Sequence, residues 1–142
     1  MSAKPSLTIQ RRINAPPSKV FAAWIEPEKV ARWWGPGGAE VVSAQSDPRV
    51  GGRFRFVSQA PGGERHDVGG EYREVVPDRK LVFTWAWHST PERESLVTLS
   101  LSGDGAGTLL TLTHEQFFDE PARDGHRKGW DAALDRLERQ FA

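Results

Sequence analysis

The stretch Leu81-Val-Phe-Thr-Trp-Ala-Trp87 indicates most clearly how this chain folds. Its largest apolar side chains, Leu81, Phe83, Trp85 and Trp87, occupy alternate positions and so share one face of an extended strand. Alternation with a period of two residues is typical of a strand that has one buried face. We therefore expect a strand over 79–88 that turns its aromatic side chains toward the interior.

The same alternation recurs on both sides of this strand. Further strand-like runs, separated by turn-rich segments, occupy 7–13, 39–46, 52–58, 67–76, 94–102 and 108–114. The glycine-rich segment 103–107 leads into a strand, whereas a phosphate-binding loop precedes a helix, so it is interpreted as a hairpin. The pattern predicts a curved antiparallel sheet of about seven strands.

Three helices complete the prediction. Prolines and a serine within 15–18 precede apolar residues at helical spacing, which predicts a helix of about two turns after the first strand. A second short helix carries Trp33 and Trp34 and ends at the glycine-rich segment 35–38. Residues 120–141 predict an amphipathic helix roughly 33 Å long, which is enough to cross the sheet. Its apolar stripe consists of His126, Trp130, Ala133, Leu134, Leu137 and Phe141. The fold class is α+β.

Length and composition limit the function. A chain of 142 residues is expected to form one domain, 1–142, in which 1–6 are an N-terminal tail. The 19 basic residues balance the 19 acidic ones, so we expect no nucleic-acid partner. The chain has no cysteine, and no signal peptide or membrane-spanning run is apparent. These features predict a cytoplasmic protein without a membrane partner.

The aromatic residues are numerous enough either to fill a core or to line a cavity. A sheet wrapped on one helix leaves a volume between them, and ligand sites of this kind are apolar with a few polar groups. Arg11, Tyr72, His114 and His126 could supply these polar groups. The predicted ligand-binding residues are Trp34, Phe54, Phe56, Tyr72, Phe83, Trp85, Trp87, Leu99, Leu112, His114, His126 and Trp130.

Other kinds of site find less support in the sequence. The pair His66-Asp67 lies in the glycine-rich segment 61–70, which is interpreted as a loop, and no metal site or cofactor is expected. No G-x-S-x-G motif occurs, and no catalytic residue is assigned. His114 and His126 are interpreted as buried, hydrogen-bonded histidines, with general acid-base catalysis as the alternative.

An ordered set of motifs resembles one known family. The motifs are Ile13-Asn-Ala-Pro-Pro-Ser-Lys-Val20, Trp33-Trp34-Gly-Pro-Gly, Val50-Gly-Gly-Arg-Phe54, Gly70-Glu-Tyr72, Arg79-Lys-Leu-Val-Phe-Thr-Trp85 and His126-Arg-Lys-Gly-Trp130. Over nearly its entire length the chain resembles bacterial members of the family named for the activator of heat-shock-protein-90 ATPase. That family lies within the START-like, or polyketide-cyclase, superfamily.

The resemblance implies a helix-grip fold, with a cavity between the sheet and the C-terminal helix that accepts hydrophobic or aromatic small molecules in relatives. The chaperone activator carries a separate N-terminal domain, which does not precede the first strand here, so we expect a role other than chaperone activation. The first hypothesis is non-enzymatic binding of such a molecule. The alternatives are a cyclase-like or hydrolase-like enzyme that uses His114 or His126 as a base, and an interaction protein. The last would dock a chaperone, or a second copy as a homodimer, through exposed aromatic residues such as Trp34.

Overall fold

The computed structural model describes residues 4–35 and 39–142. Within these ranges the elements follow the predicted order. The strands are β1 (Leu7–Ile13), β2 (Glu40–Ser46), β3 (Arg53–Gln59), β4 (Arg65–Val76), β5 (Lys80–Trp87), β6 (Ser95–Asp104) and β7 (Gly107–Glu115), and the helices are α1 (Pro17–Ile25), α2 (Pro27–Val30) and α3 (Glu120–Gln140). The predicted tail, 1–6, and the predicted end of the second helix, 35–38, lie partly outside the described residues. The second helix is shorter than predicted, because α2 ends at Val30 and both Trp33 and Trp34 lie after its end.

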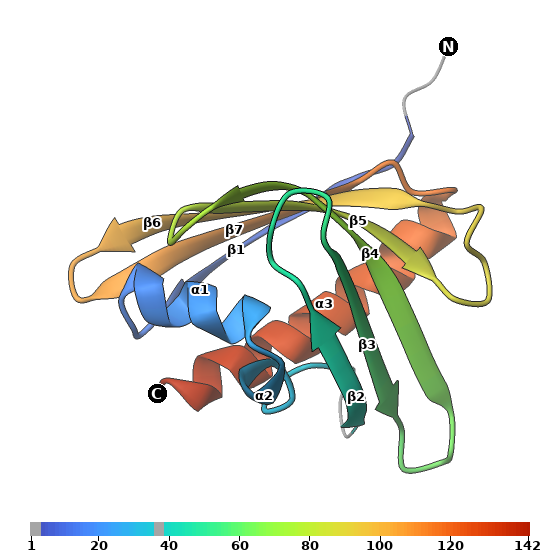
Figure 1. Cartoon of the computed structure of the whole chain (residues 1–142), viewed down its shortest axis with the longest axis horizontal. Helices are drawn as coiled ribbons and strands as arrows, with labels where there is room; N and C mark the ends of the chain where they lie inside the picture. Colours follow the sequence, from blue (N-terminus) through green and yellow to red (C-terminus); the bar gives the residue numbers. More distant parts are fainter. Residues whose placement is uncertain (1–3, 36–38) are drawn as a thin grey trace.

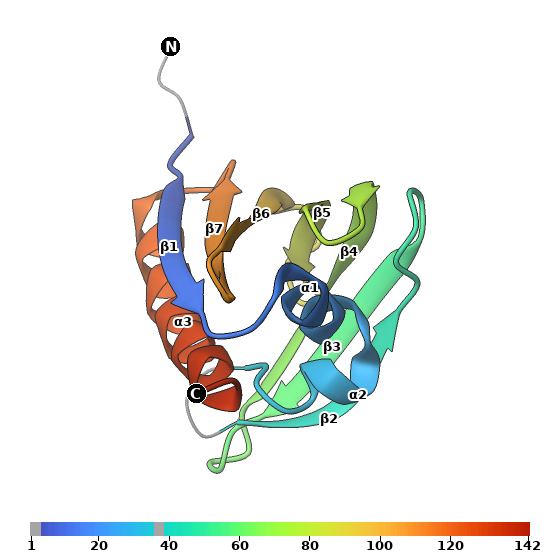
Figure 2. The same ribbon diagram turned by 90° about the vertical axis from the view of Figure 1, so that its left-hand side faces the viewer.

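All seven strands form one antiparallel sheet in the order β1-β7-β6-β5-β4-β3-β2. Figure 2 shows the strands as an arc, with α1 and α2 on its concave side and α3 running beside β1. Figure 1 shows α3 passing under the length of the sheet. This is the predicted helix-grip arrangement, and the segment 103–107 forms the predicted hairpin between β6 and β7.

Two irregularities accompany the curvature of the sheet. The register shifts between Val41 and Ser43 in β2 and again between Tyr72 and Glu74 in β4. At Gly70 the backbone of β5 comes so close that an added Cβ atom would lie 1.9 Å from a carbonyl oxygen. A residue with a side chain therefore cannot replace this glycine without moving the strands apart.

The apolar side of each strand is buried, as the alternation predicts. Leu81, Phe83 and Trp85 of β5 are all at most 5% exposed. The central strands β6 and β7 contribute further fully buried residues, among them Leu99 and Leu112. The concave face of the sheet, α1 and the inner stripe of α3 thus share one core.

Helix α3 begins at a strong capping site. The side chain of Asp119 accepts a hydrogen bond from the Ala122 backbone N–H at 2.8 Å, and Pro121 occupies the first turn. Among the residues described, no helix has both the length and the apolar character that crossing a bilayer requires.

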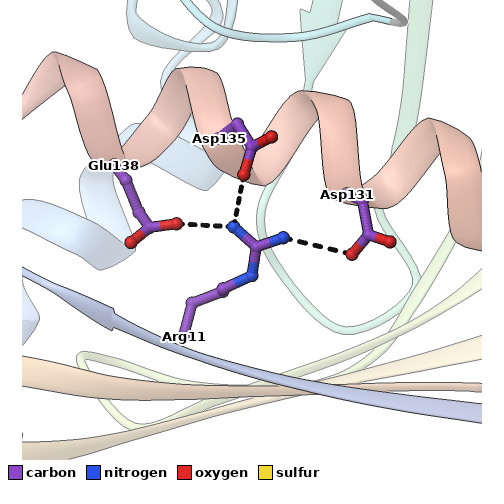
Figure 3. Close-up of polar contacts among 4 residues, drawn as sticks. All are labelled: Arg11, Asp131, Asp135 and Glu138. Carbon is purple, nitrogen blue, oxygen red and sulfur yellow. Dashed lines mark hydrogen bonds and ion pairs between the residues drawn. The ribbon is translucent and has the colours of Figure 1, made fainter.

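Three carboxylates on α3 surround one arginine of β1 (Figure 3). The Arg11 guanidinium lies 3.1 Å from Asp131, 2.6 Å from Asp135 and 2.5 Å from Glu138. Partial burial opposes the charge, but the three carboxylates outweigh it and raise the pKa of Arg11. The suggestion that Arg11 supplies a polar group to a cavity is wrong, because its side chain fastens the C-terminal half of α3 to the edge of the sheet.

Candidate functional site

A cavity of about 310 Å³ lies between the N-terminal half of α3 and the sheet. It is lined by Trp34, Gly35, Ser58, His66, Val68, Trp85, Trp87, Pro121, Ala122, Gly125, His126, Gly129, Trp130 and Ala133. It reaches the surface at the start of α3, where Pro121 and Gly125 are exposed. Ligand pockets commonly range from roughly 300 to 1,000 Å³, so this cavity suits a small molecule.

The helix wall of the cavity consists largely of residues with little or no side chain. Ala122, Gly125, Gly129 and Ala133 all line it, and a Cβ atom added at either glycine would meet no other atom within 4 Å. Glycine inside a helix is less favourable than alanine by about 1 kcal/mol. The open volume therefore exists because α3 lacks side chains where a packed core would have them.

The sheet wall is built by three neighbouring strands. Ser58 of β3 lies opposite His66 of β4, and Val68 of β4 lies opposite Trp87 of β5. Trp85 stands two residues before Trp87 and so points to the same face. The β-sheet register thus brings side chains that are distant in sequence to one concave surface.

Three tryptophans meet at the inner end of the cavity. The ring centroids of Trp85 and Trp130 are 5.0 Å apart, and Trp34 lies 5.7 Å from each of them. Such contacts between aromatic rings are favourable and hold the rings in fixed orientations. The three rings therefore form a preformed aromatic surface on this side of the cavity.

His114 lies behind this surface and is completely buried. The Trp130 Nε1–H donates to His114 Nδ1 at 3.0 Å, so the ring proton resides on Nε2, which donates to Ser95 Oγ at 2.7 Å. The Ser95 hydroxyl in turn donates to the carbonyl of Trp85. Burial, with a smaller contribution from His126, lowers the pKa of His114 to about 2, so the ring is neutral.

His126 is held at the cavity wall in a comparable way. Its Nδ1–H donates to the Ala122 carbonyl at 2.6 Å, and its Nε2 accepts from the Trp87 Nε1–H at 2.9 Å. Burial lowers the pKa of His126, although the carbonyl of Ala122 opposes this effect. In both histidines the nitrogen that could accept a proton from a substrate is already bonded to an indole N–H.

The cavity wall is largely apolar. No Asp, Glu, Lys or Arg side chain lines it within the described residues. Within those residues there is also no group of three His, Asp or Glu side chains close enough to hold a metal ion. The lining residues that have polar side-chain atoms are Ser58, His66, His126 and the four tryptophans Trp34, Trp85, Trp87 and Trp130.

The predicted site residues fall into two groups. Trp34, Trp85, Trp87, His126 and Trp130 line the cavity. The remaining seven do not line it. Phe54, Phe56, Tyr72 and Phe83 pack with Trp24 and Leu81 around a gap of only about 10 Å³, while Leu99, Leu112 and His114 are fully buried. The aromatic residues of the first part of the sheet therefore fill the core, and those near the start of α3 leave it open.

Three expectations about individual residues differ from the structure. His66 lies on β4 rather than in a loop, because the strand begins at Arg65 and pairs with β3. Tyr72 donates to or accepts from Ser46 at 2.8 Å, away from the cavity. Trp34 is only 6% exposed, so it is not a surface aromatic that could dock a partner.

Nine of the fourteen lining residues were absent from the predicted site, and among these Ser58 and His66 carry polar side chains. The available signal was the alternation of His66, Val68 and Gly70, which continues the inward face of Tyr72 along β4. Because glycines surround His66, the segment was interpreted as a loop and this alternation was not recognised. Ser58 has the same relation to Phe54 and Phe56 on β3.

Comparison with known structures gives the same fold along almost the whole chain. Protein CV1439 from Chromobacterium violaceum is 26% identical, with a TM-score of 0.86 over 96% of this chain and 97% of that one. The AHSA1 (SPO3351) protein from Silicibacter pomeroyi is 29% identical, with a TM-score of 0.85 over 96% of each chain. CalU16 from Micromonospora echinospora is 29% identical, with a TM-score of 0.70 over 96% of this chain and 76% of that one.

Among curated proteins, none matches this chain. A family model described as Activator of Hsp90 ATPase homolog 1-like protein matches residues 14–142. This match covers every element from α1 to α3 and agrees with the similarity to the solved structures. The chain therefore belongs to the family of Activator of Hsp90 ATPase homolog 1-like proteins.

Proposed function

We propose that this protein binds a small, uncharged, apolar molecule, preferably an aromatic one, in the cavity between α3 and the sheet. Membership of the family supports a ligand-binding domain in general terms. The observation that carries the specific proposal is the glycine and alanine wall of α3 facing a set of tryptophans across open space. A helix with larger side chains at Gly125 and Gly129 would be more stable and would close this space.

The size of the cavity limits the ligand. An engineered apolar cavity of about 150 Å³ accommodates one benzene molecule. A cavity of about 310 Å³ is thus suited to a molecule of about two rings. A long fatty acid would have to leave most of its chain in solvent.

The hydrogen bonding of the histidines favours binding over catalysis. A general base needs a free lone pair within reach of the proton that it removes. The lone pair of His114 accepts from Trp130, and that of His126 accepts from Trp87. A cyclase-like or hydrolase-like reaction that uses either ring as a base would first have to break these bonds.

The proposal can be tested with a graded series at Gly129. We expect that Gly129→Ala raises the melting temperature by a few degrees, since a helix-interior glycine costs about 1 kcal/mol relative to alanine. Gly129→Leu should fill the cavity and weaken binding of two-ring probes such as tetralin and 1-tetralone at least about tenfold. Tryptophan fluorescence and ligand-induced shifts of the melting temperature measure both effects.

Lys128→Leu is the matched control, because Lys128 is exposed on the same helix and does not line the cavity. It should leave binding unchanged. Palmitate should bind more weakly than the two-ring probes. The proposal fails if no uncharged two-ring compound changes the tryptophan emission or the melting temperature of the parent protein, or if Gly129→Leu binds as well as the parent.

A further inference from the structure

Three side chains at the cavity wall can both donate and accept a hydrogen bond, namely Ser58, His66 and His126. The Ser58 Oγ atom is buried away from the open space. Both ring nitrogens of His126 are already bonded, one to the Ala122 carbonyl and the other to the Trp87 indole N–H. Of the three, His66 therefore remains as the side chain that a ligand could use.

The ring nitrogens of His66 are neither bonded nor buried. Within the part of the chain that the structure describes, they form no hydrogen bond with the protein, and they are not among the buried polar atoms that lack a partner. The side chain of His66 is half-buried. Both nitrogens therefore keep surface that water or a ligand can reach.

The strand register places His66 beside the aromatic wall. His66 and Val68 project from the same face of β4, and Val68 lies opposite Trp87 of β5. The ring centroids of His66 and Trp87 are 6.2 Å apart. Because His66 lines the cavity and is also partly exposed, it belongs to the rim, where the cavity meets solvent.

The chemistry of the imidazole defines the complementary group. A neutral imidazole has one donor and one acceptor nitrogen, and no hydrogen bond within the described residues fixes which nitrogen of His66 takes which role. A hydroxyl can donate or accept, so it fits either tautomer, whereas a carbonyl oxygen can only accept. At the rim a hydroxyl also keeps part of its hydration, which limits the cost of desolvation.

We propose that the cavity favours aromatic ligands that carry a hydroxyl group, and that the imidazole of His66 binds this hydroxyl at the rim. The proposal rests on the proposed function, because it specifies the chemistry of the same ligand. It adds an orientation, in which the rings enter the cavity and the hydroxyl stays at its opening.

The test compares naphthalene with 1-naphthol and 2-naphthol, which have the same two rings and one hydroxyl at different positions. The tighter-binding naphthol is used, since the position of the hydroxyl decides whether it reaches the rim. The absolute preference over naphthalene is not informative, because the naphthol loses more hydration on binding. The effect of a substitution at His66 on each ligand removes this difference.

His66→Leu is the informative variant, because leucine can pack against Trp87 but cannot form a hydrogen bond. We expect it to weaken the naphthol roughly three- to tenfold, as one hydrogen bond is lost, and to change naphthalene less than about twofold. His66→Gln keeps a donor and an acceptor, so its affinity for the naphthol should lie between that of His66→Leu and the parent. Isothermal titration calorimetry measures these affinities.

His66→Leu should fold normally, since the ring has no hydrogen bond to lose among the described residues. His88→Leu is the matched control, because His88 is exposed and does not line the cavity, and it should affect neither ligand. As a second readout, the ring ¹⁵N resonances of His66 should move on addition of the naphthol, as a hydrogen bond forms, and much less with naphthalene.

The outcomes separate the two proposals. If naphthalene and the naphthol bind the parent but His66→Leu weakens both equally or neither, the hydroxyl proposal is overturned and the binding function stands. An equal loss of naphthol affinity in His88→Leu would also overturn it. If none of the three compounds binds the parent, both proposals fail.

Discussion

At the scale of single residues, His114 is the polar centre of the core. It accepts from Trp130 and donates to Ser95, and both partners are buried. His114→Leu would leave the Trp130 indole N–H without a partner and remove one of the two hydrogen bonds of the Ser95 hydroxyl, which keeps the bond to the Trp85 carbonyl. A buried group that loses its partner costs about 1–3 kcal/mol, and one lost hydrogen bond about 1 kcal/mol. We expect the free energy of unfolding, measured by urea denaturation near neutral pH, to fall by about 2–4 kcal/mol.

His114→Gln provides the control for this change. A glutamine side chain has one acceptor and one donor, so it can restore part of the network. We expect a smaller loss than for the leucine variant. A leucine variant as stable as the parent would show that the hydrogen bonds of His114 contribute nothing to the fold.

The sequence predicted the environment of single residues only in part. Alternation in β7 places His114 on the inner face, but its depth follows from the position of β7 between β1 and β6, which is a long-range property. His66 was assigned to a loop because glycines surround it, and only pairing with Ser58 of β3 makes it part of a strand. Side-chain contacts across the sheet are not encoded in any one local segment.

At the scale of elements, the cluster of Arg11 with Asp131, Asp135 and Glu138 joins α3 to β1 (Figure 3). Arg11→Met keeps much of the side chain but leaves three carboxylates facing one another without a cation. Because the carboxylates are partly exposed, solvent screens the effect, and we expect a loss of about 1–2 kcal/mol at low salt.

The salt dependence and a conservative variant show whether lost ion pairing causes the stability loss of Arg11→Met. The difference between Arg11→Met and the parent in urea denaturation should shrink as salt is raised to about 1 M, where the screening length is about 3 Å. Arg11→Lys should lie between the two, because a lysine cannot reach all three carboxylates in the same fork geometry. A difference independent of salt would instead indicate lost packing.

The elements themselves followed from the sequence far better than the cavity did. Hydrophobic periodicity is local, and it located β5 and α3 to within a few residues. The cavity exists because α3 has glycines instead of larger residues on the side that faces the sheet. Gly125 and Gly129, inside an otherwise good amphipathic helix, were the available signal, and their meaning appears only when the helix is laid against the sheet.

At the scale of the whole molecule, the same residue types perform two different tasks. Phe54, Tyr72 and Phe83 fill the core beneath α1, whereas Trp85, Trp87 and Trp130 border an open volume beneath the start of α3. A count of aromatic residues cannot distinguish filling from lining, because the outcome depends on what stands opposite each ring. The fold thus combines a closely packed part with a part that contains a cavity.

The stability of the whole molecule should also depend on pH in a window set by its buried histidines. The pKa of His114 is lowered to about 2 and that of His126 is lowered as well, whereas an unfolded histidine titrates near about 6.5. Below that pH the unfolded chain takes up protons that the folded chain cannot, so stability is full above about pH 6.5 and falls as the pH decreases. Paired carboxylates lose their contribution at lower pH: Arg55 lowers the pKa of Asp67 below its ordinary value, so its protonation destabilises the fold only under more acidic conditions.

Between about pH 7 and about pH 5, His114 alone should therefore cost roughly 2 kcal/mol of unfolding free energy, and His126 adds to this loss. Urea denaturation at the two pH values measures the change. In His114→Gln the loss of unfolding free energy between these pH values should be smaller by the roughly 2 kcal/mol that His114 contributes, because glutamine does not titrate. Equal stability of the parent protein at both values would mean that the folded chain takes up these protons, and the neutral, indole-bonded state of the two rings would then be incorrect.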